Sequence, residues 1–184
     1  PEPKVGRSAG PTSYVRSAMG NTPAPPSLED AYRRYFPAIR EKCRRMLGDA
    51  EEAQDVAQET FVRLWRSGPT AVDGPQVLGW AYRTSTRLAI DRLRRRALQT
   101  HEATTALQPE PPSSVDAVLD ARNQLASMAT RLPQEDLELL ILERIDGLTQ
   151  PETALLLGTS ERTIRRRAAR AHARLERLQA ELRT

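Results

Sequence analysis

Six apolar residues near the end of the chain recur alternately four and three residues apart. They are Ile164, Ala168, Ala171, Leu175, Leu178 and Leu182. This is the spacing of one face of an α-helix, because one helical turn takes 3.6 residues. The sixteen residues from Ser160 to Leu175 also contain six arginines, and no acidic residue lies between Arg162 and Arg174. The pattern predicts a helix with one buried apolar face and one strongly basic face.

The whole chain favours helices over strands. It has 184 residues, of which 39% are hydrophobic and only 4% aromatic, and Ala, Leu, Arg and Glu are good helix formers. Residues 1–26, rich in Pro, Gly, Ser and Thr, are expected to be a disordered tail. Residues 98–116 include three prolines and are expected to be a linker. The predicted fold is all-α, with two small helical domains, 27–97 and 117–184, joined by a flexible linker.

The first domain is predicted to contain four helical stretches. Ser27 is expected to cap one that begins at Leu28, with a further helix running through Met46 and Leu47 until Gly48. The next begins near Asp49 or Glu51. Its predicted apolar stripe is Ala53, Val56, Ala57, Thr60, Phe61, Leu64 and Trp65. The last helix is expected over Val77 to about Arg96, and its predicted buried residues are Trp80, Thr84, Leu88, Ile90 and Leu93.

The second domain carries the signature of a helix-turn-helix. Helices are expected over residues 118–131 and 134–145, followed by Thr149 and Glu152 in a capping box. The short helix that follows ends before Gly158, and Ser160 caps the arginine-rich helix. Two short helices, a turn containing glycine and a basic second helix are typical of DNA-binding domains.

The basic face of the last helix has two interpretations. It is either a solvated arginine surface or a DNA-binding surface. A solvated helix usually alternates Glu with Arg, and this one does not, so the sequence favours DNA.

Charge is also distributed unevenly in the first domain. Residues 49–60 carry five acidic residues and no Lys or Arg, whereas residues 83–96 carry six arginines and one Asp, within a net charge of +4. Blocks of opposite sign suggest separate partners. Asp55, Gln58 and Glu59 form the acidic face, which is either solvated, as periodicity alone slightly favours, or a surface for a basic protein partner.

Other classes of function lack support in the sequence. Cys43 is the one cysteine, and His101 and His172 stand alone, so no metal or cofactor site is predicted. No apolar run is long enough for a membrane span and no signal peptide is evident, so we expect a cytoplasmic protein without membrane insertion. No clustered nucleophile, acid–base pair or phosphate loop suggests an enzyme.

Three segments resemble bacterial RNA polymerase sigma factors of the extracytoplasmic-function (ECF) type of the sigma-70 family. They are EEAQDVAQETFVRLW, WAYRTSTRLAIDRLRRR and LPQEDLELLILERIDGLTQPETALLLGTSERTIRRRAARAHARL, and the resemblance covers residues 28–97 and 118–180. It implies that the first domain, sigma region 2, binds the clamp helices of core RNA polymerase and melts the minus-ten promoter element. It implies that the second, region 4, reads the minus-thirty-five element of promoter DNA. An anti-sigma factor is implied as a further partner.

The resemblance also assigns residues. Polymerase binding falls on Asp55, Gln58 and Glu59. Minus-ten DNA binding falls on Trp80, Tyr82, Arg83, Arg87, Asp91, Arg92, Arg94 and Arg95, with a flipped base expected in the loop 67–76. Minus-thirty-five DNA binding falls on Ser160, Arg162, Thr163, Arg165, Arg166, Arg167 and Arg170. Trp80 is equally consistent with a core position. Thr84, Thr86, Arg87 and Thr153 depart from the residues common in the family.

One alternative function remains open at the level of sequence. A helix-turn-helix regulator would bind operator DNA without being a polymerase subunit, usually as a dimer. It would need no acidic surface on the first domain.

Overall fold

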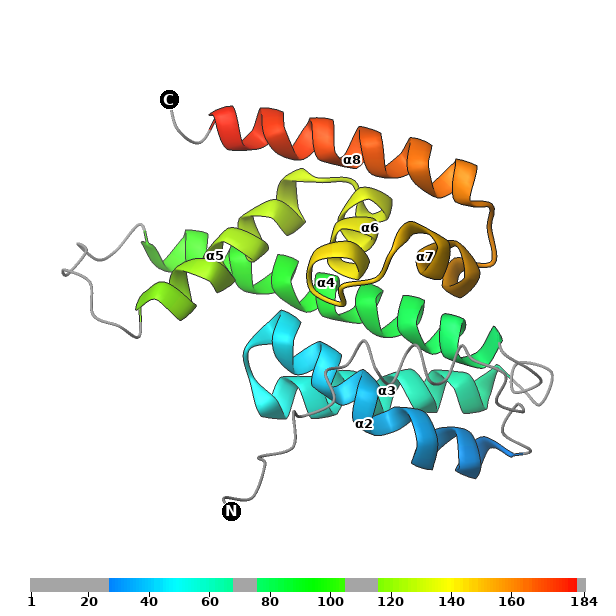
Figure 1. The fold of residues 1–184 in the computed structure, drawn as a ribbon. Helices are drawn as coiled ribbons and strands as arrows, with labels where there is room; N and C mark the ends of the chain where they lie inside the picture. The colour runs from blue at the N-terminus through cyan, green and yellow to red at the C-terminus, as the bar shows by residue number, and fades with distance from the viewer. Residues whose placement is uncertain (1–26, 68–75, 105–115, 182–184) are drawn as a thin grey trace, which may run out of the picture.

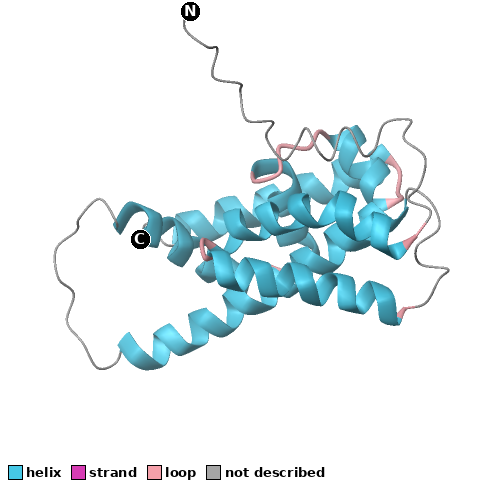
Figure 2. Cartoon of the chain, turned by 90° about the horizontal axis from the view of Figure 1, so that it is seen from below, coloured by secondary structure: helices cyan, strands magenta, loops and turns pink. Residues whose placement is uncertain are grey.

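A computed structural model describes residues 27–67, 76–104 and 116–181, and within these ranges the regular structure is entirely helical (Figures 1 and 2). The helices are α2 (Leu28–Leu47), α3 (Ala50–Arg66), α4 (Gln76–Thr104), α5 (Asp116–Arg131), α6 (Gln134–Arg144), α7 (Gln150–Leu157) and α8 (Glu161–Glu181). The predicted all-α class and the helix-turn-helix are therefore confirmed. The expected tail, most of the loop after α3 and the centre of the linker lie outside the described residues.

Helix α2 is one helix, so the prediction of two helices over this segment was wrong. Ser27 accepts a hydrogen bond from the backbone of Asp30 at its start, and Gly48 ends it at a φ of 65°, which favours glycine. Pro37 lies inside the helix and is exposed, although proline removes a backbone hydrogen bond. Tyr35 and Ile39, on either side of it, are both buried in the core. Their shared packing keeps the two halves of the segment in one helix.

Helix α3 follows the predicted apolar stripe except at its end. Asp49 caps it by accepting hydrogen bonds from the backbone of Glu51 and Glu52. All members of the stripe up to Leu64 are buried, but Trp65 is 70% exposed. Leu64 takes the core position, and Trp65, about 100° further round the helix, points to solvent.

Helix α4 is the central element, and it is longer than predicted. It continues to Thr104 rather than ending near Arg96. Figure 1 shows it between α2 and α3 on one side and α5, α6 and α7 on the other. Ile90 and Leu93 are buried as predicted, whereas Trp80, Thr84 and Leu88 are only half-buried. Its other buried apolar residues are Val77, Leu78, Ala81, Tyr82 and Ala89. A helix covered on two sides buries more than one stripe, which the sequence pattern did not anticipate.

The C-terminal half is built around α6. Every residue from Asp136 to Leu142 is buried, because α6 is surrounded by α4, α5, α7 and α8. Core residues of the two halves, such as Phe61 and Leu93 from the first and Ile141 from the second, belong to one continuous cluster. The two helical units therefore pack directly on each other.

Glu138 of α6 is a buried acid at the contact between the halves. Burial raises the pKa of its carboxyl, and the positive charges of Arg87, Lys42 and Arg83 oppose that effect. The Nε atom of Arg87 on α4 lies 3.9 Å from a carboxylate oxygen of Glu138. Keeping Glu138 ionised therefore costs stability at neutral pH.

We expect Glu138→Gln to increase the free energy of unfolding at pH 7 and to change it much less at pH 4. A carboxyl whose pKa is higher in the folded state loses stability as pH rises from its unfolded value, near 4.5, through the folded value. Glutamine has no charge to bury. Urea unfolding at both pH values measures the difference, with the exposed Glu135→Gln as control. An equal change at both pH values would contradict this explanation.

Candidate protein and nucleic-acid interfaces

The acidic face of α3 borders a groove. Asp55 and Gln58 are exposed, and Glu59 is half-exposed and bonded to Arg63 at 2.7 Å. Together with Val62, they line a groove of about 440 Å³ whose opposite wall is α4. That wall is Leu88, Arg92 and Arg95. The structure thus brings the predicted polymerase-binding residues next to two arginines predicted to bind minus-ten DNA.

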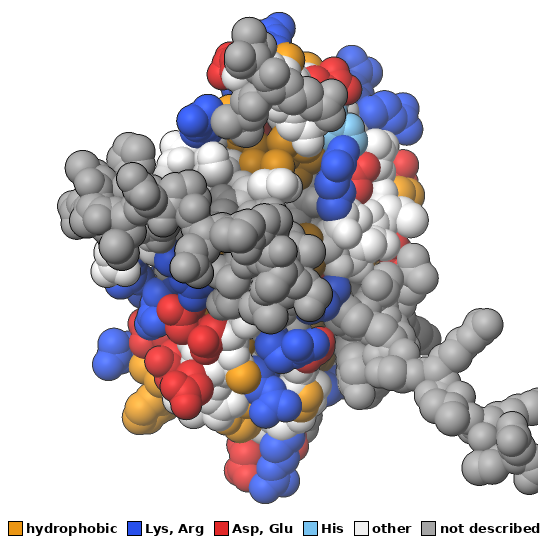
Figure 3. Space-filling view, turned by 90° about the vertical axis from the view of Figure 1, so that its left-hand side faces the viewer, with side chains coloured by type: hydrophobic (Ala, Val, Ile, Leu, Met, Phe, Trp, Pro, Cys, Tyr) orange, Lys and Arg blue, Asp and Glu red, His pale blue; other side chains and the backbone are white. Residues whose placement is uncertain are grey.

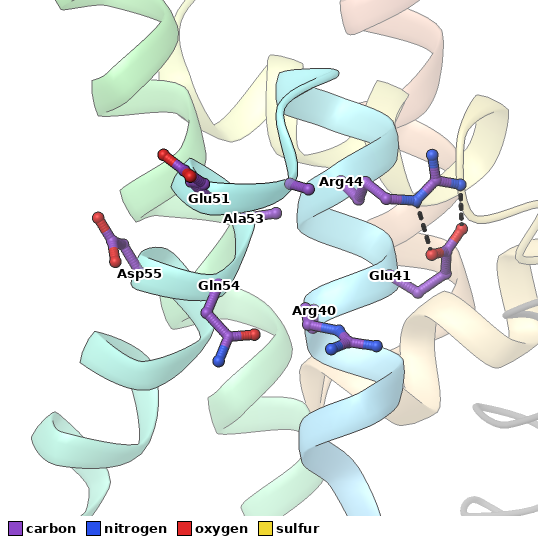
Figure 4. Close-up of a pocket in the computed structure, with 8 residues that line it drawn as sticks. Arg40, Glu41, Arg44, Glu51, Ala53, Gln54 and Asp55 are labelled. Carbon is purple, nitrogen blue, oxygen red and sulfur yellow. Dashed lines mark hydrogen bonds and ion pairs between the residues drawn. The ribbon is translucent and has the colours of Figure 1, made fainter.

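A second groove, of about 730 Å³, lies on the other side of α3 (Figure 4). Gln54 and Asp55 of α3 line it together with Arg40 and Glu41 of α2. Glu41 accepts hydrogen bonds from Arg44 at 2.7 and 2.9 Å, which lowers the pKa of its carboxyl. The sequence patterns did not single out the α2 residues. Asp55 lines both grooves, so a partner contacting it could reach either helix.

One face of the molecule carries acidic and basic side chains close together. Figure 3 shows both kinds side by side in its lower part, where Figure 1 places α2 and α3.

The predicted minus-ten residues of α4 differ widely in exposure. Arg87, Asp91 and Arg95 are exposed, while Trp80, Arg83, Arg92 and Arg94 are half-buried. Trp80 packs against the core but is only partly buried. It therefore fits neither a pure core position nor a fully exposed DNA-binding position. The two exposed arginines, Arg87 and Arg95, lie eight residues apart on α4.

Tyr82 occupies the core in this structure. Its relative exposure is 0%, and burial raises the pKa of its hydroxyl. Lys42 of α2 lies with Nζ 4.2 Å from the ring centroid and donates a hydrogen bond to the Tyr82 carbonyl oxygen at 3.2 Å. In this arrangement Tyr82 supports the position of α4 and does not face a ligand.

Lys42 is an important residue that the sequence patterns missed. Its side chain is fully buried and also donates to the hydroxyl of Thr86. Thr86 in turn donates to the Tyr82 carbonyl oxygen at 2.7 Å. Thr86 is one of the residues that depart from the family pattern. It has a structural role here, because its hydroxyl accepts a hydrogen bond from the buried Lys42 amine. No periodicity marks a lysine that occupies a core position of an amphipathic helix.

The helix-turn-helix is held by local hydrogen bonds. Thr149 and Glu152 form a capping box at the start of α7, and Gly158 ends that helix at a φ of 62°. The Ser160 hydroxyl accepts a hydrogen bond from the Thr163 backbone at 3.2 Å. These contacts fix the angle at which α8 leaves the turn, and Ser160 and Thr163 of the predicted site contribute to it.

The predicted DNA-binding arginines lie together on the free side of α8. Ile164, Ala168, Ala171, Leu175 and Leu178 are buried as predicted, while Leu182 lies outside the described residues. Arg162, Arg165, Arg166 and Arg170 are exposed and Arg167 is half-buried. None of these five has an ion pair with another described residue, whereas Arg174 pairs with Asp136 and His172 with Glu143. Unpaired arginines at the start of a helix are suited to phosphate and base contacts.

Neither a membrane span nor a metal site is present in the described part of the chain. None of the helices in the described ranges is both long and apolar enough to cross a membrane. The same residues contain no cluster of three or more His, Cys, Asp or Glu side chains that could hold a metal ion.

Comparison with known families gives matches in both halves of the chain. Residues 31–99 match the family Sigma-70 region 2, and residues 122–175 match Sigma-70, region 4. The first range contains α3 and most of α4 with their grooves, and the second contains the helix-turn-helix. The two regions occur in the order that the sequence predicted.

Individual relatives extend across most of the chain. The ECF RNA polymerase sigma factor SigE of Mycolicibacterium smegmatis is 30% identical over 167 residues, which are 88% of this chain and 65% of SigE. The ECF RNA polymerase sigma factor SigW of Bacillus subtilis is 29% identical over 149 residues, covering 74% of this chain and 80% of SigW. The ferric citrate uptake sigma factor FecI of Escherichia coli is 29% identical over 161 residues, covering 84% and 92%.

A solved structure supports the fold. CnrH, in complex with the cytosolic domain of CnrY, superimposes with a TM-score of 0.51 at 23% identity, covering 92% of this chain and 97% of CnrH. The likeness thus includes both helical halves. With both sigma regions matched in order and relatives of 29% and 30% identity over most of the chain, the protein belongs to the sigma-70 family of RNA polymerase sigma factors and, within it, to the ECF type.

Proposed function

We propose that this protein binds core RNA polymerase and directs it to particular promoters through separate contacts of its two halves. The observation that carries the proposal is the separation of charge. In one half, the acidic face of α3 borders a groove. In the other half, α8 carries five arginines that form no ion pair with another described residue. An operator-binding regulator would need the second surface but not the first.

Polymerase docking is assigned to α3. Asp55 and Gln58 are exposed and Glu59 is half-exposed, so all three are available without rearrangement of the core. The grooves on both sides of Asp55 give a helical partner room to pack. Electrostatic complementarity at such a surface contributes mainly to specificity and the rate of association.

Minus-ten binding is assigned to the polar side of α4. Arg87, Arg92 and Arg95 provide cations for the strand backbone, and Trp80 provides a partly accessible ring for stacking on an unpaired base. Arg83, Asp91 and Arg94 lie on the same helix and belong to the proposed surface. Tyr82 contributes from the core by positioning α4.

Minus-thirty-five binding is assigned to α8. Its N-terminal turns carry Arg162, Arg165, Arg166, Arg167 and Arg170, and Ser160 and Thr163 order the start of the helix. A recognition helix enters the major groove with its N-terminal residues facing the bases. Phosphate contacts are expected to supply much of the affinity and to make it dependent on salt.

The remaining features follow from this role. The protein acts as a specificity subunit without a catalytic step of its own, in the cytoplasm where polymerase works. An anti-sigma factor that binds the free protein completes the set of partners. Residues 27–97 form the unit for polymerase and minus-ten DNA, residues 117–184 the unit for the minus-thirty-five element, and 98–116 the connection.

The test separates this function from that of an operator-binding regulator. The full chain is mixed with purified core RNA polymerase and analysed by size exclusion, and its binding to duplex DNA is measured with and without polymerase. We expect a stoichiometric complex with core and sequence-specific DNA binding only within that complex. Tight binding to a palindromic duplex by the chain alone, with no core complex, would assign it to the regulators.

A further inference from the structure

Arg96 of α4 contacts protein groups that the arginines before it do not. It follows a run of arginines that the proposed function assigns to minus-ten DNA, but it belongs to no predicted binding set itself. Its guanidinium donates a hydrogen bond to the Leu47 carbonyl oxygen at 3.1 Å. It donates another to a carboxylate oxygen of Glu52 at 2.5 Å. Arg96 is therefore bound to the turn between α2 and α3.

The two acceptors belong to the ends of two different helices. Leu47 is the last residue of α2, and Glu52 lies in the first turn of α3. The last carbonyl groups of a helix have no donor within that helix, so Arg96 supplies one from outside. A cation at this end of α2 also interacts favourably with the helix dipole. Only Gly48 and Asp49 separate the two helices, so one side chain binds both sides of a short turn.

The contact with Glu52 is partly shielded from water. The side chain of Arg96 is 29% exposed and that of Glu52 is 34% exposed. A charge-assisted hydrogen bond in such a place is stronger than an exposed ion pair. Arginine presents its donors in one rigid plane, so it also fixes its acceptors relative to each other. These bonds hold the start of α3 against α4.

The start of α3 determines where the polymerase-binding face lies. Asp55 follows Glu52 by three residues, so the two lie on neighbouring turns on one side of the helix. Asp55 lines the groove whose opposite wall includes Arg92 and Arg95 of α4. Arg96 is the next residue in that wall's helix. One short segment of α4 therefore forms a wall of the groove and holds the helix that faces it.

We infer that Arg96 is a positioning residue for polymerase binding, because it holds the start of α3, and with it Asp55, in a fixed place against α4. The inference rests on the proposed function for the identity of the partner. In this role Arg96 touches neither polymerase nor DNA. Its loss leaves Asp55 chemically intact but lets α3 shift. Binding must then restore the position of α3, which lowers the affinity.

Two variants weaken the contact from its two sides. Arg96→Met removes both hydrogen bonds and keeps a good helix former in α4. Glu52→Gln removes the charge of the acceptor and keeps an oxygen that can accept. The matched control is Arg174→Met, because it is the same substitution in the C-terminal half and also removes an ion pair, with Asp136. Circular dichroism and urea unfolding check that each variant is folded.

The first readout is local opening of α3 in the free chain, and it needs no partner. Hydrogen exchange at the backbone amides of residues 53–59 should be about 10-fold faster in Arg96→Met than in wild type. Glu52→Gln should change it in the same direction by less. We expect no change at these amides in Arg174→Met. Wild-type exchange in a folded Arg96→Met would overturn the inference.

The second readout is affinity for core RNA polymerase. We expect Arg96→Met to weaken binding about 10-fold and Arg174→Met to bind as wild type does. If Arg96 acts through Asp55, its loss should cost less than about two-fold when Asp55→Asn is already present. A general loss of stability would give the same fold-loss in both backgrounds, and that result would overturn the inference.

Promoter DNA separates this role from direct contact with DNA. In the polymerase complex, each lost phosphate contact reduces the slope of log affinity against log salt by about one. We expect Arg96→Met to keep the wild-type slope. A reduced slope with unchanged core affinity would assign Arg96 to DNA and overturn the inference. Failure of the proposed function would be seen separately: wild type would not bind core polymerase, while hydrogen exchange would still show whether Arg96 holds α3.

Discussion

Asp55→Lys/Glu59→Lys is expected to reduce the affinity of the chain for core RNA polymerase by at least about 100-fold, because like charges at an interface cost several kcal/mol. Asp55 is exposed and Glu59 half-exposed, and the buried stripe of α3 is untouched, so the fold should persist. The one ion pair that the substitutions remove within the described ranges joins Glu59 to Arg63, and it is exposed and contributes little to stability. A binding titration against labelled core, with circular dichroism to check folding, measures the effect.

The matched control is Glu29→Lys/Glu135→Lys, at two exposed acidic residues that line neither groove. These substitutions change the net charge equally, and Glu29 loses one exposed ion pair, with Arg33, as Glu59 loses one with Arg63. We expect the control to bind core with nearly wild-type affinity. Equal losses for the two double variants would mean that net charge, and not the α3 surface, determines binding.

Arg165→Ala/Arg166→Ala is expected to abolish recognition of the minus-thirty-five element. Each arginine removed should cost about 1–3 kcal/mol if it reads a base, or reduce the salt slope by about one if it contacts a phosphate. Both side chains are exposed and without ion pairs among the described residues, so stability should not change. DNA binding by the polymerase complex over a range of salt distinguishes the two kinds of contact.

Arg177→Ala/Arg66→Ala is the control for that experiment. Both arginines are exposed, and the same charge is removed at places outside the predicted DNA-binding set. Wild-type promoter affinity is expected for this variant. A comparable loss would show that the overall positive charge, rather than the start of α8, holds the promoter.

The sequence predicted best where one helix buries one face. The stripes of α3 and α8 followed the 3.6-residue period, and their polar faces indicated the candidate sites. It failed at α4, which is covered on both sides. There Tyr82 is buried although the resemblance assigns it to DNA, and the helix continues past Arg96.

Contacts between distant segments were beyond the reach of pattern analysis. Lys42 and Asp146 lie on different helical units, far apart along the chain, and neither belongs to a motif that names the other. Gly79 looks like a weak point in a helix until the position of Leu156 is known. Such features depend on how the halves pack, which local periodicity does not encode.

The central claim is tested most directly by initiation itself. Core RNA polymerase is supplied with this chain and with DNA from upstream of the chain's own gene, and run-off transcripts are mapped. We expect a discrete transcript that requires the chain, is lost with Asp55→Lys/Glu59→Lys, and is preceded by minus-thirty-five and minus-ten elements protected in the complex. Unchanged transcription with and without the chain, from every promoter tested, would contradict the account.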